Sequence, residues 1–406
     1  MAKPTLALIP ASQGSKLFSV LPSSGVGDFD FSRGSAATRI NSKGLIENVA
    51  SGQSRLDYPL IDGEVVGCPH HILEPARLQL IQYSEAFDNA WWTKQDASIT
   101  SNQAISPDGT LNADLYTTSS DFYDFVRRPF NFTSGDTYTL SIFVKSGTSN
   151  EVRLDFPSAF TDRSTSFNIE NKTYTQVTGS PISKIEDYGN GWYRCSITST
   201  AISTSSGTTG FSNSKPIAIS TLYLWGAMLE EGSFPTSYIP NYGTSAGVTR
   251  SAETAIGAGD ASTFNDSEGV FMVEMSALAN DGTSRLISIA NLSGSENAIW
   301  IGFNNGSGTP YFYLISSGSA QASYVSSINA ENTNVKLAVK YKANDVSFYV
   351  NGFELYKDTS ATMPIGLTQL RFSRKGGSLP FYGKNKQIQY YNTALTDSEL
   401  EQLTSW

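Results

Sequence analysis

The chain is poor in cysteine and histidine: its 406 residues include two of each, Cys68, Cys195, His70 and His71. Two cysteines so far apart in sequence exclude a disulfide framework and a cysteine-based zinc site. Adjacent strand residues point to opposite faces, and no HxxxH, HExxH or His/Cys cluster accompanies the histidine pair. We therefore expect no metal site of this kind and a structural or surface role for both histidines.

Charged side chains are also scarce. They make up 16% of the chain, against about a quarter in typical soluble domains. The 28 Lys and Arg are outnumbered by 37 Asp and Glu, which gives a formal net charge of −9. A polyanionic partner requires clustered Lys and Arg, and pairs such as Arg127–Arg128 are too short for that. We expect no nucleic-acid partner.

Long hydrophobic runs are absent too. No stretch of about 18 apolar residues occurs, so we expect no membrane insertion. The apolar stretch near the N-terminus is broken by Pro10 and is too short for a signal peptide. The sequence therefore predicts synthesis in a cytoplasm without a cleaved signal.

Aromatic residues, by contrast, reach 12% of the chain, with 22 Phe, 20 Tyr and 6 Trp, which indicates a folded protein. Residues 1–80 are rich in Gly, Pro, Ser and Arg and predict an extended arm that docks against something else. Residues 81–247 and 268–406 each contain many short strand patterns, and residues 248–267 are small and polar, typical of a linker.

Period-2 alternation of apolar residues, as in 138–145 and 335–341, is the pattern of half-buried strands. Asn351-Gly352 predicts a tight hairpin. Thr396 and Glu399 form a capping box for a single short C-terminal helix. The sequence predicts an all-β fold: an N-terminal docking arm followed by two antiparallel β-sandwiches, the first of jelly-roll type.

The last third resembles the LamG-like, concanavalin A-like lectin and glucanase sandwich. The resemblance rests on residues 335–341, on 346–352, and on Ile388-Gln-Tyr-Tyr-Asn-Thr-Ala-Leu-Thr-Asp-Ser-Glu-Leu400. It implies a concanavalin A-like second sandwich, a fold that serves sugar binding, protein binding and plain structure.

The first two parts resemble structural proteins of tailed phages that carry a carbohydrate-binding-module-like jelly roll. The matching pieces include Phe29-Asp-Phe-Ser-Arg-Gly-Ser-Ala-Ala-Thr38, Ile72-Leu-Glu-Pro-Ala-Arg77 and Tyr83-Ser-Glu-Ala-Phe-Asp-Asn-Ala-Trp-Trp-Thr-Lys94. The resemblance implies a virion location, other virion proteins as partners and a homotrimer. It also implies a virion-docking motif with these residues: Phe31, Arg33, Thr38, Gly44, Pro75 and Arg77.

No catalytic residues are predicted. Glycoside hydrolysis requires two carboxyl groups across a cleft, but Glu230 and Glu231 are sequence neighbours that diverge in an extended chain. The C-terminal part also lacks the Glu-x-Asp-x-x-Glu run that glucanases of the resembled fold present. Asn and Asp are frequent in loops, such as Asn344-Asp345, where turn chemistry is favoured over a calcium site. We expect no enzyme and no cofactor, with calcium as the minority alternative.

Flat aromatic rings are the best signal for sugar binding, because pyranose rings stack on them, although most aromatic residues of sandwiches belong to the core. The candidate carbohydrate-binding residues are Tyr123, Phe125, Trp192, Trp300, Tyr311 and Tyr313.

Three functions stay open. The first is a phage tail- or head-attached fibre or appendage that contributes to adhesion to a host surface glycan. The second is a purely architectural capsid or tail component without a ligand. The third is a secreted polysaccharide-binding or polysaccharide-degrading module.

Overall fold

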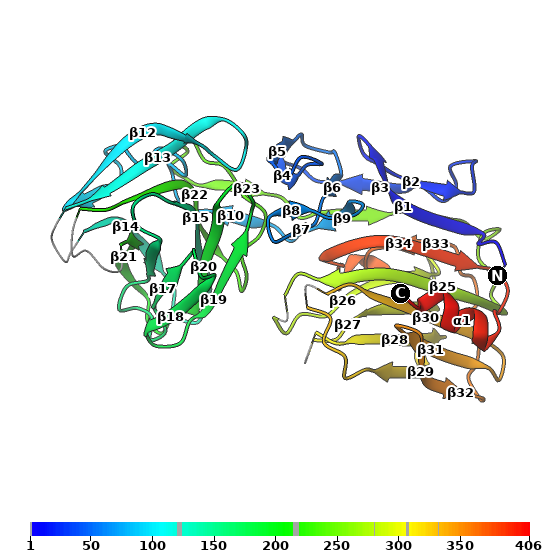
Figure 1. Ribbon diagram of the computed structural model, residues 1–406. Helices are drawn as coiled ribbons and strands as arrows, with labels where there is room; N and C mark the ends of the chain where they lie inside the picture. Colours follow the sequence, from blue (N-terminus) through cyan, green and yellow to red (C-terminus); the bar gives the residue numbers. More distant parts are fainter. Residues whose placement is uncertain (1, 120–123, 214–218, 280, 306–307, 332) are drawn as a thin grey trace.

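The computed structural model describes residues 2–119, 124–213, 219–279, 281–305, 308–331 and 333–406. Within these residues the chain is built from β-strands, with one α-helix, α1 (Asp397–Thr404), and one 3-10 turn, η1 (Lys375–Gly377). Figure 1 shows two bodies side by side, one from the middle of the chain and one that unites its two ends. The predicted all-β class is confirmed.

The first sandwich, formed by the middle of the chain, consists of two antiparallel sheets. Apolar residues alternate along its strands: Leu140, Ile142 and Val144 lie in the core opposite Phe211 of the other sheet. One sheet has the order β12 (Ala97–Ile105), β13 (Leu111–Thr118), β22 (Thr221–Glu231), β15 (Thr137–Ser146), β20 (Trp192–Thr200), β19 (Ile182–Asp187). The other has the order β11 (Thr93–Gln95), β14 (Phe125–Phe132), β21 (Ser205–Ser212), β16 (Glu151–Asp155), β17 (Ser164–Asn168), β18 (Thr173–Thr178).

The second sandwich packs a large sheet on a five-stranded one. Phe271, Val273 and Met275 of the large sheet share a core with Ile287 and Ile299 of the small sheet. The large sheet has the order β24 (Thr254–Ile256), β3 (Phe29–Ser32), β2 (Lys16–Leu21), β1 (Leu6–Gln13), β34 (Gly383–Tyr391), β25 (Glu268–Ala277), β30 (Val335–Lys342), β31 (Val346–Val350), β32 (Phe353–Asp358). The small sheet has the order β29 (Ser319–Val325), β28 (Pro310–Ser316), β27 (Ala298–Phe303), β26 (Arg285–Ala290), β33 (Gln369–Arg371). The prediction of two antiparallel sandwiches is therefore confirmed.

The N-terminal segment, residues 1–80, docks on the chain's own second sandwich. β1 pairs with β34 through Leu6↔Tyr390 and Leu8↔Ile388, and Leu6 and Leu8 are fully buried in the second sandwich's core. β6 (Arg55–Asp57) and β9 (His70–Leu73) join the same sheet. Without β1, the pairing edge of β34 would expose unpaired backbone groups. The partner of the expected docking arm thus belongs to the same molecule.

The segment expected to be a linker, residues 248–267, contributes short strands. β23 (Val248–Arg250) pairs with β10 (Arg77–Gln79) beside the first sandwich. β24 pairs with β3 through Ala255↔Phe31. The polar composition suggested a free connection, but the N-terminal strands offer it unpaired hydrogen-bonding edges. This part of the prediction is corrected.

Two small hairpins of the N-terminal segment lie between the bodies. β4 (Ala37–Ile40) pairs with β5 (Ile46–Val49), and β7 (Leu60–Ile61) pairs with β8 (Glu64–Val65). The tip of the second hairpin contacts the first sandwich: a Cβ placed on Gly63 would lie 2.6 Å from Cα of Gly189. These hairpins bring the N-terminal segment against both sandwiches (Figure 1).

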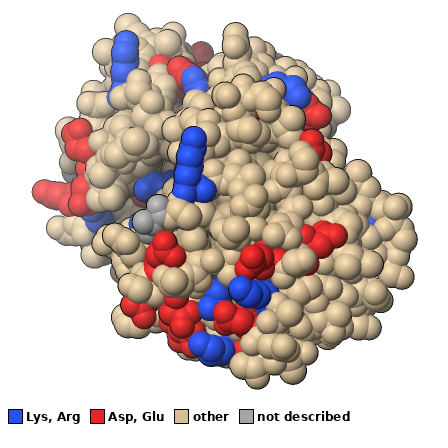
Figure 2. Space-filling view, turned by 90° about the vertical axis from the view of Figure 1, so that its right-hand side faces the viewer, with Lys and Arg blue, Asp and Glu red and all other residues tan. Residues whose placement is uncertain are grey.

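The C-terminal elements follow their local signals. Asn351 and Gly352 both have positive φ, as the tight turn between β31 and β32 requires. Thr396 and Glu399 form the predicted capping box at α1. Leu400 and Leu403 of α1 cover the outer face of the large sheet. Figure 2 shows the face at this end of the molecule, where charges of both signs are scattered over a mostly uncharged surface.

Candidate functional site

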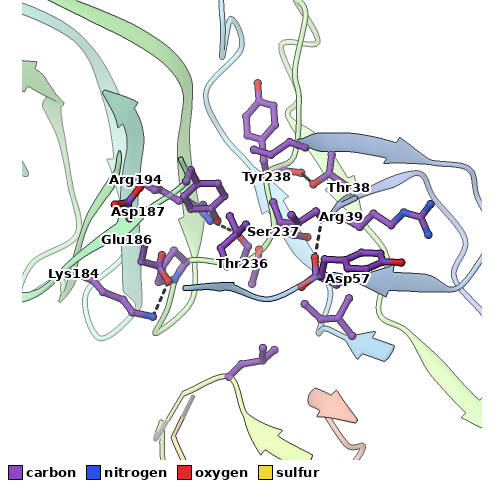
Figure 3. A pocket seen from close by; sticks show the side chains of 18 of the residues that line it. Thr38, Arg39, Asp57, Lys184, Glu186, Asp187, Arg194, Thr236, Ser237 and Tyr238 are labelled. Atoms are coloured by element: carbon purple, nitrogen blue, oxygen red, sulfur yellow. Dashed lines mark hydrogen bonds and ion pairs between the residues drawn. The ribbon is translucent and has the colours of Figure 1, made fainter. Parts of the chain in front are cut away.

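A cleft of about 380 Å³ opens where the N-terminal segment meets both sandwiches. We call it the junction cleft. Its walls come from residues 38–74, from 172–194 of the first sandwich, from 235–238, and from Leu278 and Lys384 of the second sandwich. Figure 3 shows Lys184, Glu186 and Asp187 on one side, Thr236 to Tyr238 in the middle, and Thr38, Arg39 and Asp57 on the other.

The charges of the junction cleft balance. Five cationic side chains line it, namely Arg39, Lys172, Lys184, Arg194 and Lys384, and five anionic ones, namely Asp57, Asp62, Glu74, Glu186 and Asp187. Lys184 Nζ lies 3.0 Å from Glu186 Oε1, and Lys172 Nζ lies 3.0 Å from Asp187 Oδ2. The cleft therefore presents many polar groups but no excess of either sign.

Three carboxyl groups of the cleft have lowered pKa values: Glu74, which belongs to a buried ion network described below, Asp57 and Glu186. Burial acts to raise the pKa of Asp57, but Lys384 and the hydrogen bond with His70 outweigh it and hold the pKa at about 2. Burial also opposes ionisation of Glu186, yet Lys184 and Arg194 keep its pKa below the usual value. Both side chains are ionised at neutral pH, so neither can donate a proton to a leaving group.

Two half-buried tyrosines, Tyr58 and Tyr188, add aromatic surface to the cleft. The ring of Tyr188 stands edge-on to Phe143, with 4.8 Å between ring centroids. Tyr238, in contrast, is buried. The cleft thus combines flat apolar faces with charged and hydroxyl groups.

Behind the cleft lies a buried ion network that no local sequence signal indicated. Glu253 accepts hydrogen bonds from Arg33 and Arg55, the former at 2.7 Å. Glu74 binds Arg55 and Arg250, each with 2.8 Å between nitrogen and oxygen. All five side chains are at most 2% exposed. The network connects Arg33, Arg55 and Glu74 of the N-terminal segment with Arg250 and Glu253.

The comparisons with known proteins concern parts of the chain. Residues 271–401 match the family model of the concanavalin A-like lectin/glucanases superfamily. No curated protein matches the chain in sequence. The predicted concanavalin A-like module at the C-terminus is thereby confirmed, and residues 268–406 are called the concanavalin A-like domain below.

Among solved structures, one similar chain is the carbohydrate-binding module CBM40 of the Ruminococcus gnavus IT-sialidase bound to α2,3-sialyllactose. It is 17% identical with a TM-score of 0.29, and the match covers 35% of this chain and 84% of that one. Another is domain 4 of an extracellular arabinanase from Geobacillus stearothermophilus in complex with arabinotriose. It is 15% identical with a TM-score of 0.30, and the match covers 38% and 73% of the two chains.

The concanavalin A-like domain brings three of the predicted sugar-binding aromatics together. Trp300 lies 5.6 Å from Tyr313, and Tyr313 lies 5.6 Å from Tyr311, measured between ring centroids. Trp300 and Tyr311 are only 7% and 4% exposed, and the guanidinium of Arg374 covers the Trp300 ring at 4.8 Å. As they stand, these two rings offer little surface for stacking.

The predicted aromatics of the first sandwich are dispersed. Trp192 is 1% exposed, and its indole N–H donates to the carbonyl of Ile105 at 2.9 Å. It is a core residue, which corrects its assignment as a sugar contact, because a buried ring has no free face. Phe125 is half-buried beneath the guanidinium of Arg127 at 3.5 Å. Tyr123 lies outside the described residues.

The residues predicted to form a virion-docking motif make contacts within the chain. Thr38 Oγ1 donates to the carbonyl of Tyr238 at 2.6 Å, and Arg250 Nη2 donates to the carbonyl of Pro75 at 2.8 Å. Arg33 belongs to the buried ion network, and Phe31 lies in the core of the second sandwich. Gly44, with φ of +77°, closes the hairpin between β4 and β5, and Arg77 stacks on Phe234 at 5.2 Å.

Phe31, Arg33 and Thr38 are buried within the molecule, so their side chains are not presented to a particle. Gly44, Pro75 and Arg77 are half-buried, and their assignment to docking stays a prediction. The pattern of Gly, Pro and Arg in sequence reflects tight turns and buried cations in the N-terminal segment.

No metal centre is visible among the side chains that the structure describes: no group of three or more His, Cys, Asp or Glu could hold an ion. Asp281, in one of the Asn- and Asp-rich loops, accepts from Arg285 and from the backbone of Thr283. Both histidines are buried, which agrees with a structural role. Over the same described residues, no helix has the length and apolar character needed to cross a membrane.

Proposed function

We propose that this protein binds carbohydrate without cleaving it, and that the junction cleft is one contact surface. The observation that carries the proposal is the cleft's lining of equal numbers of cations and anions beside two tyrosines. Sugar hydroxyl groups both donate and accept hydrogen bonds, so an uncharged, hydroxyl-rich ligand fits such a lining. The match of residues 271–401 to a superfamily of lectins and glucanases supports the proposal.

The lowered pKa values of Asp57 and Glu186 in the cleft support binding without hydrolysis. Glycosidases need one carboxyl group whose raised pKa keeps it protonated as the general acid. The pKa values of Asp57 and Glu186 are shifted in the opposite direction. A polysaccharide in the cleft would meet acceptors for its hydroxyl groups but no proton donor among these two.

Binding and cleavage are tested together by calorimetric titration with purified glucan, galactan, mannan, alginate and hyaluronate, followed by an assay for reducing ends. We expect binding to at least one uncharged polysaccharide and no reducing ends. The double variant Lys184→Ala/Glu186→Ala, which removes a whole ion pair, should weaken binding about tenfold, or 1.4 kcal/mol.

The matched control is Lys16→Ala/Asp30→Ala, which removes an exposed ion pair on β2 and β3 and should bind like the wild type. Release of reducing ends would refute the non-catalytic role. No measurable binding to any of the five polysaccharides would refute carbohydrate binding and favour the purely architectural alternative.

The finer role that we propose is that of a phage virion appendage, a tail or head fibre that adheres to a host surface polysaccharide. It is supported by the resemblance of the first two parts to tailed-phage structural proteins. In a homotrimer, three weak sites would act together on one polysaccharide. Because Phe31, Arg33 and Thr38 are buried within the chain, attachment to the particle would use other residues.

Immunogold labelling of purified virions with an antibody against this chain tests the location, and light scattering after size exclusion tests for a mass three times that of the chain. Labelled particles support the appendage. Unlabelled particles, together with polysaccharide binding by the purified protein, would favour the secreted polysaccharide-binding alternative.

A further inference from the structure

The first sandwich contains a second hollow, of about 400 Å³, which we call the tyrosine pocket. It is lined by residues of the loop 83–89, of β12 at 101–102, of β13 at 112–114, and by Asn241 and Tyr242. None of these residues lines the junction cleft. In Figure 1 the strands β12 and β13 lie along the outer edge of the first sandwich.

A carboxylate is fixed in this pocket by three neighbours. Glu85 Oε1 accepts hydrogen bonds from the hydroxyl groups of Tyr238 at 2.8 Å and Tyr242 at 3.2 Å. Glu85 Oε2 accepts from the side-chain amide of Asn112 at 3.0 Å. The carboxylate is therefore held in one orientation before a ligand arrives, which lowers the entropic cost of binding.

The walls of the pocket are held equally firmly. Asp114 is buried and accepts from the backbone N–H of Phe87 at 2.9 Å and of Asn102 at 3.0 Å, so it ties the loop 83–89 to β12. The backbone N–H of Asn241 donates to Ser84 Oγ at 2.9 Å. These bonds join all four segments of the pocket into one rigid frame.

Two tyrosines form the rim. Tyr83 and Tyr242 face each other across an antiparallel bridge, and opposite residues of such a bridge place their side chains on the same face. Tyr242 is 69% exposed although its hydroxyl group is anchored at Glu85. A large aromatic ring that is held in place and left open to solvent is a suitable stacking face for a pyranose ring.

The polar groups of the pocket select the charge of its ligand. Glu85, Asp88 and Asp114 line it, whereas no Lys or Arg does, so an anionic sugar would be repelled. Asn112 Oδ1 is buried, so the side chain of Asn112 serves to orient Glu85 through its amide N–H and is not itself a ligand contact.

We propose that the tyrosine pocket binds an uncharged hexose unit of a glycan, which stacks on Tyr242 and donates a hydroxyl hydrogen bond to Glu85. This site goes beyond the junction cleft, because it has its own frame, its own aromatic face and a different charge. It would make the chain at least bivalent towards a polysaccharide.

The full-length chain is tested by saturation-transfer difference NMR with glucose, galactose and mannose, and with glucuronic acid as the anionic counterpart. We expect the wild type to bind at least one of the three hexoses and glucuronic acid at least tenfold more weakly. Tyr242→Ala should weaken hexose binding at least tenfold, and Tyr242→Phe, which keeps the ring, should weaken it less.

Tyr174→Ala is the matched control, since Tyr174 is an exposed tyrosine (46%) of β18 in the other sheet of the same sandwich. Both tyrosines are exposed, so the variants should keep the wild-type melting temperature. The inference is overturned if no hexose binds, if Tyr242→Ala binds like the control, or if glucuronic acid binds as tightly as the hexoses.

The junction-cleft variant Lys184→Ala/Glu186→Ala separates the two proposals. It should weaken polysaccharide binding, and in this background Tyr242→Ala should still weaken the hexose signal at least tenfold, because the two sites share no residue. If it weakens polysaccharide binding and Tyr242→Ala changes neither measurement, the tyrosine pocket is refuted and the proposed function stands.

Discussion

Several buried carboxylates of this chain are kept ionised and hydrogen-bonded by partners that are remote in sequence. Glu74 and Glu253 are 179 positions apart, yet the backbone N–H of Glu74 donates to the carboxylate of Glu253 at 2.8 Å. Asp57 is ionised because Lys384 and His70 surround it. A buried charge requires a nearby partner of opposite charge or a hydrogen-bond donor. The buried charges therefore mark the places where distant parts of the chain contact one another.

His71 is the residue whose burial has the clearest consequence. It is 1% exposed, and neither ring nitrogen has a hydrogen-bond partner among the described residues. Burial, with a smaller contribution from His70, lowers the pKa of His71 to about 3. Between about pH 6.5 and pH 3 the unfolded chain therefore binds a proton at this residue that the folded chain does not. Folding is destabilised as the pH falls through this window, by up to about 1.4 kcal/mol per pH unit.

Replacing His71 by leucine should remove this contribution. We expect the loss of unfolding free energy between pH 7 and pH 5, measured by urea titration, to be smaller in His71→Leu than in the wild type. Lys16→Ala, an exposed change, should keep the wild-type loss. An equal loss in His71→Leu would show that the imidazole is protonated in the folded chain.

At the scale of elements, the segments with local signals formed as predicted. The Asn351-Gly352 turn and the capping box of α1 depend on backbone dihedrals and on side chains three residues apart. The Thr396 side chain accepts from the backbone of Glu399, and the Glu399 side chain accepts from the backbone of Thr396. Such contacts are complete within a few residues, which is why the sequence reveals them.

The capping box should have a measurable share in stability. Thr396→Ala removes the acceptor for an orphan N–H at the start of α1, and we expect a loss of about 1 kcal/mol in urea-induced unfolding. Ser398→Ala, an exposed position of the same helix, should change stability by less than about 0.5 kcal/mol. Equal effects of the two variants would mean that the cap is not formed.

At the scale of the whole molecule, the two ends of the chain form one sheet. β1 lies between β2 and β34 in the large sheet, and β24 closes its far edge. The second sandwich therefore contains, besides strands of the concanavalin A-like domain, strands from residues 6–32 that precede the first sandwich in sequence. The buried ion network lies where this shared sheet meets the junction cleft.

Removing one charged side chain tests how much the buried ion network contributes to the stability of the full chain. Glu253→Gln leaves the guanidinium groups of Arg33 and Arg55 without their shared carboxylate, and breaking a buried ionic network typically costs about 3–5 kcal/mol. We expect a loss of that size in the urea-induced unfolding of the full chain. Lys16→Ala breaks an exposed ion pair and should have little effect. If the two variants unfold alike, the network does not join the parts.

The sequence by itself determined the all-β class, both sandwiches, the hairpin turn and the single helix, because alternation, turn residues and caps act between near neighbours. Only the tertiary structure decided that strands of the N-terminal segment complete the second sandwich, that residues 248–267 contain the short strands β23 and β24, and that Trp192 is core. It also placed Tyr242 on the rim of a pocket with Glu85 and Asn112. Pairing between strands hundreds of residues apart depends on which edges remain free after the sandwiches form, and no short stretch of sequence contains that information.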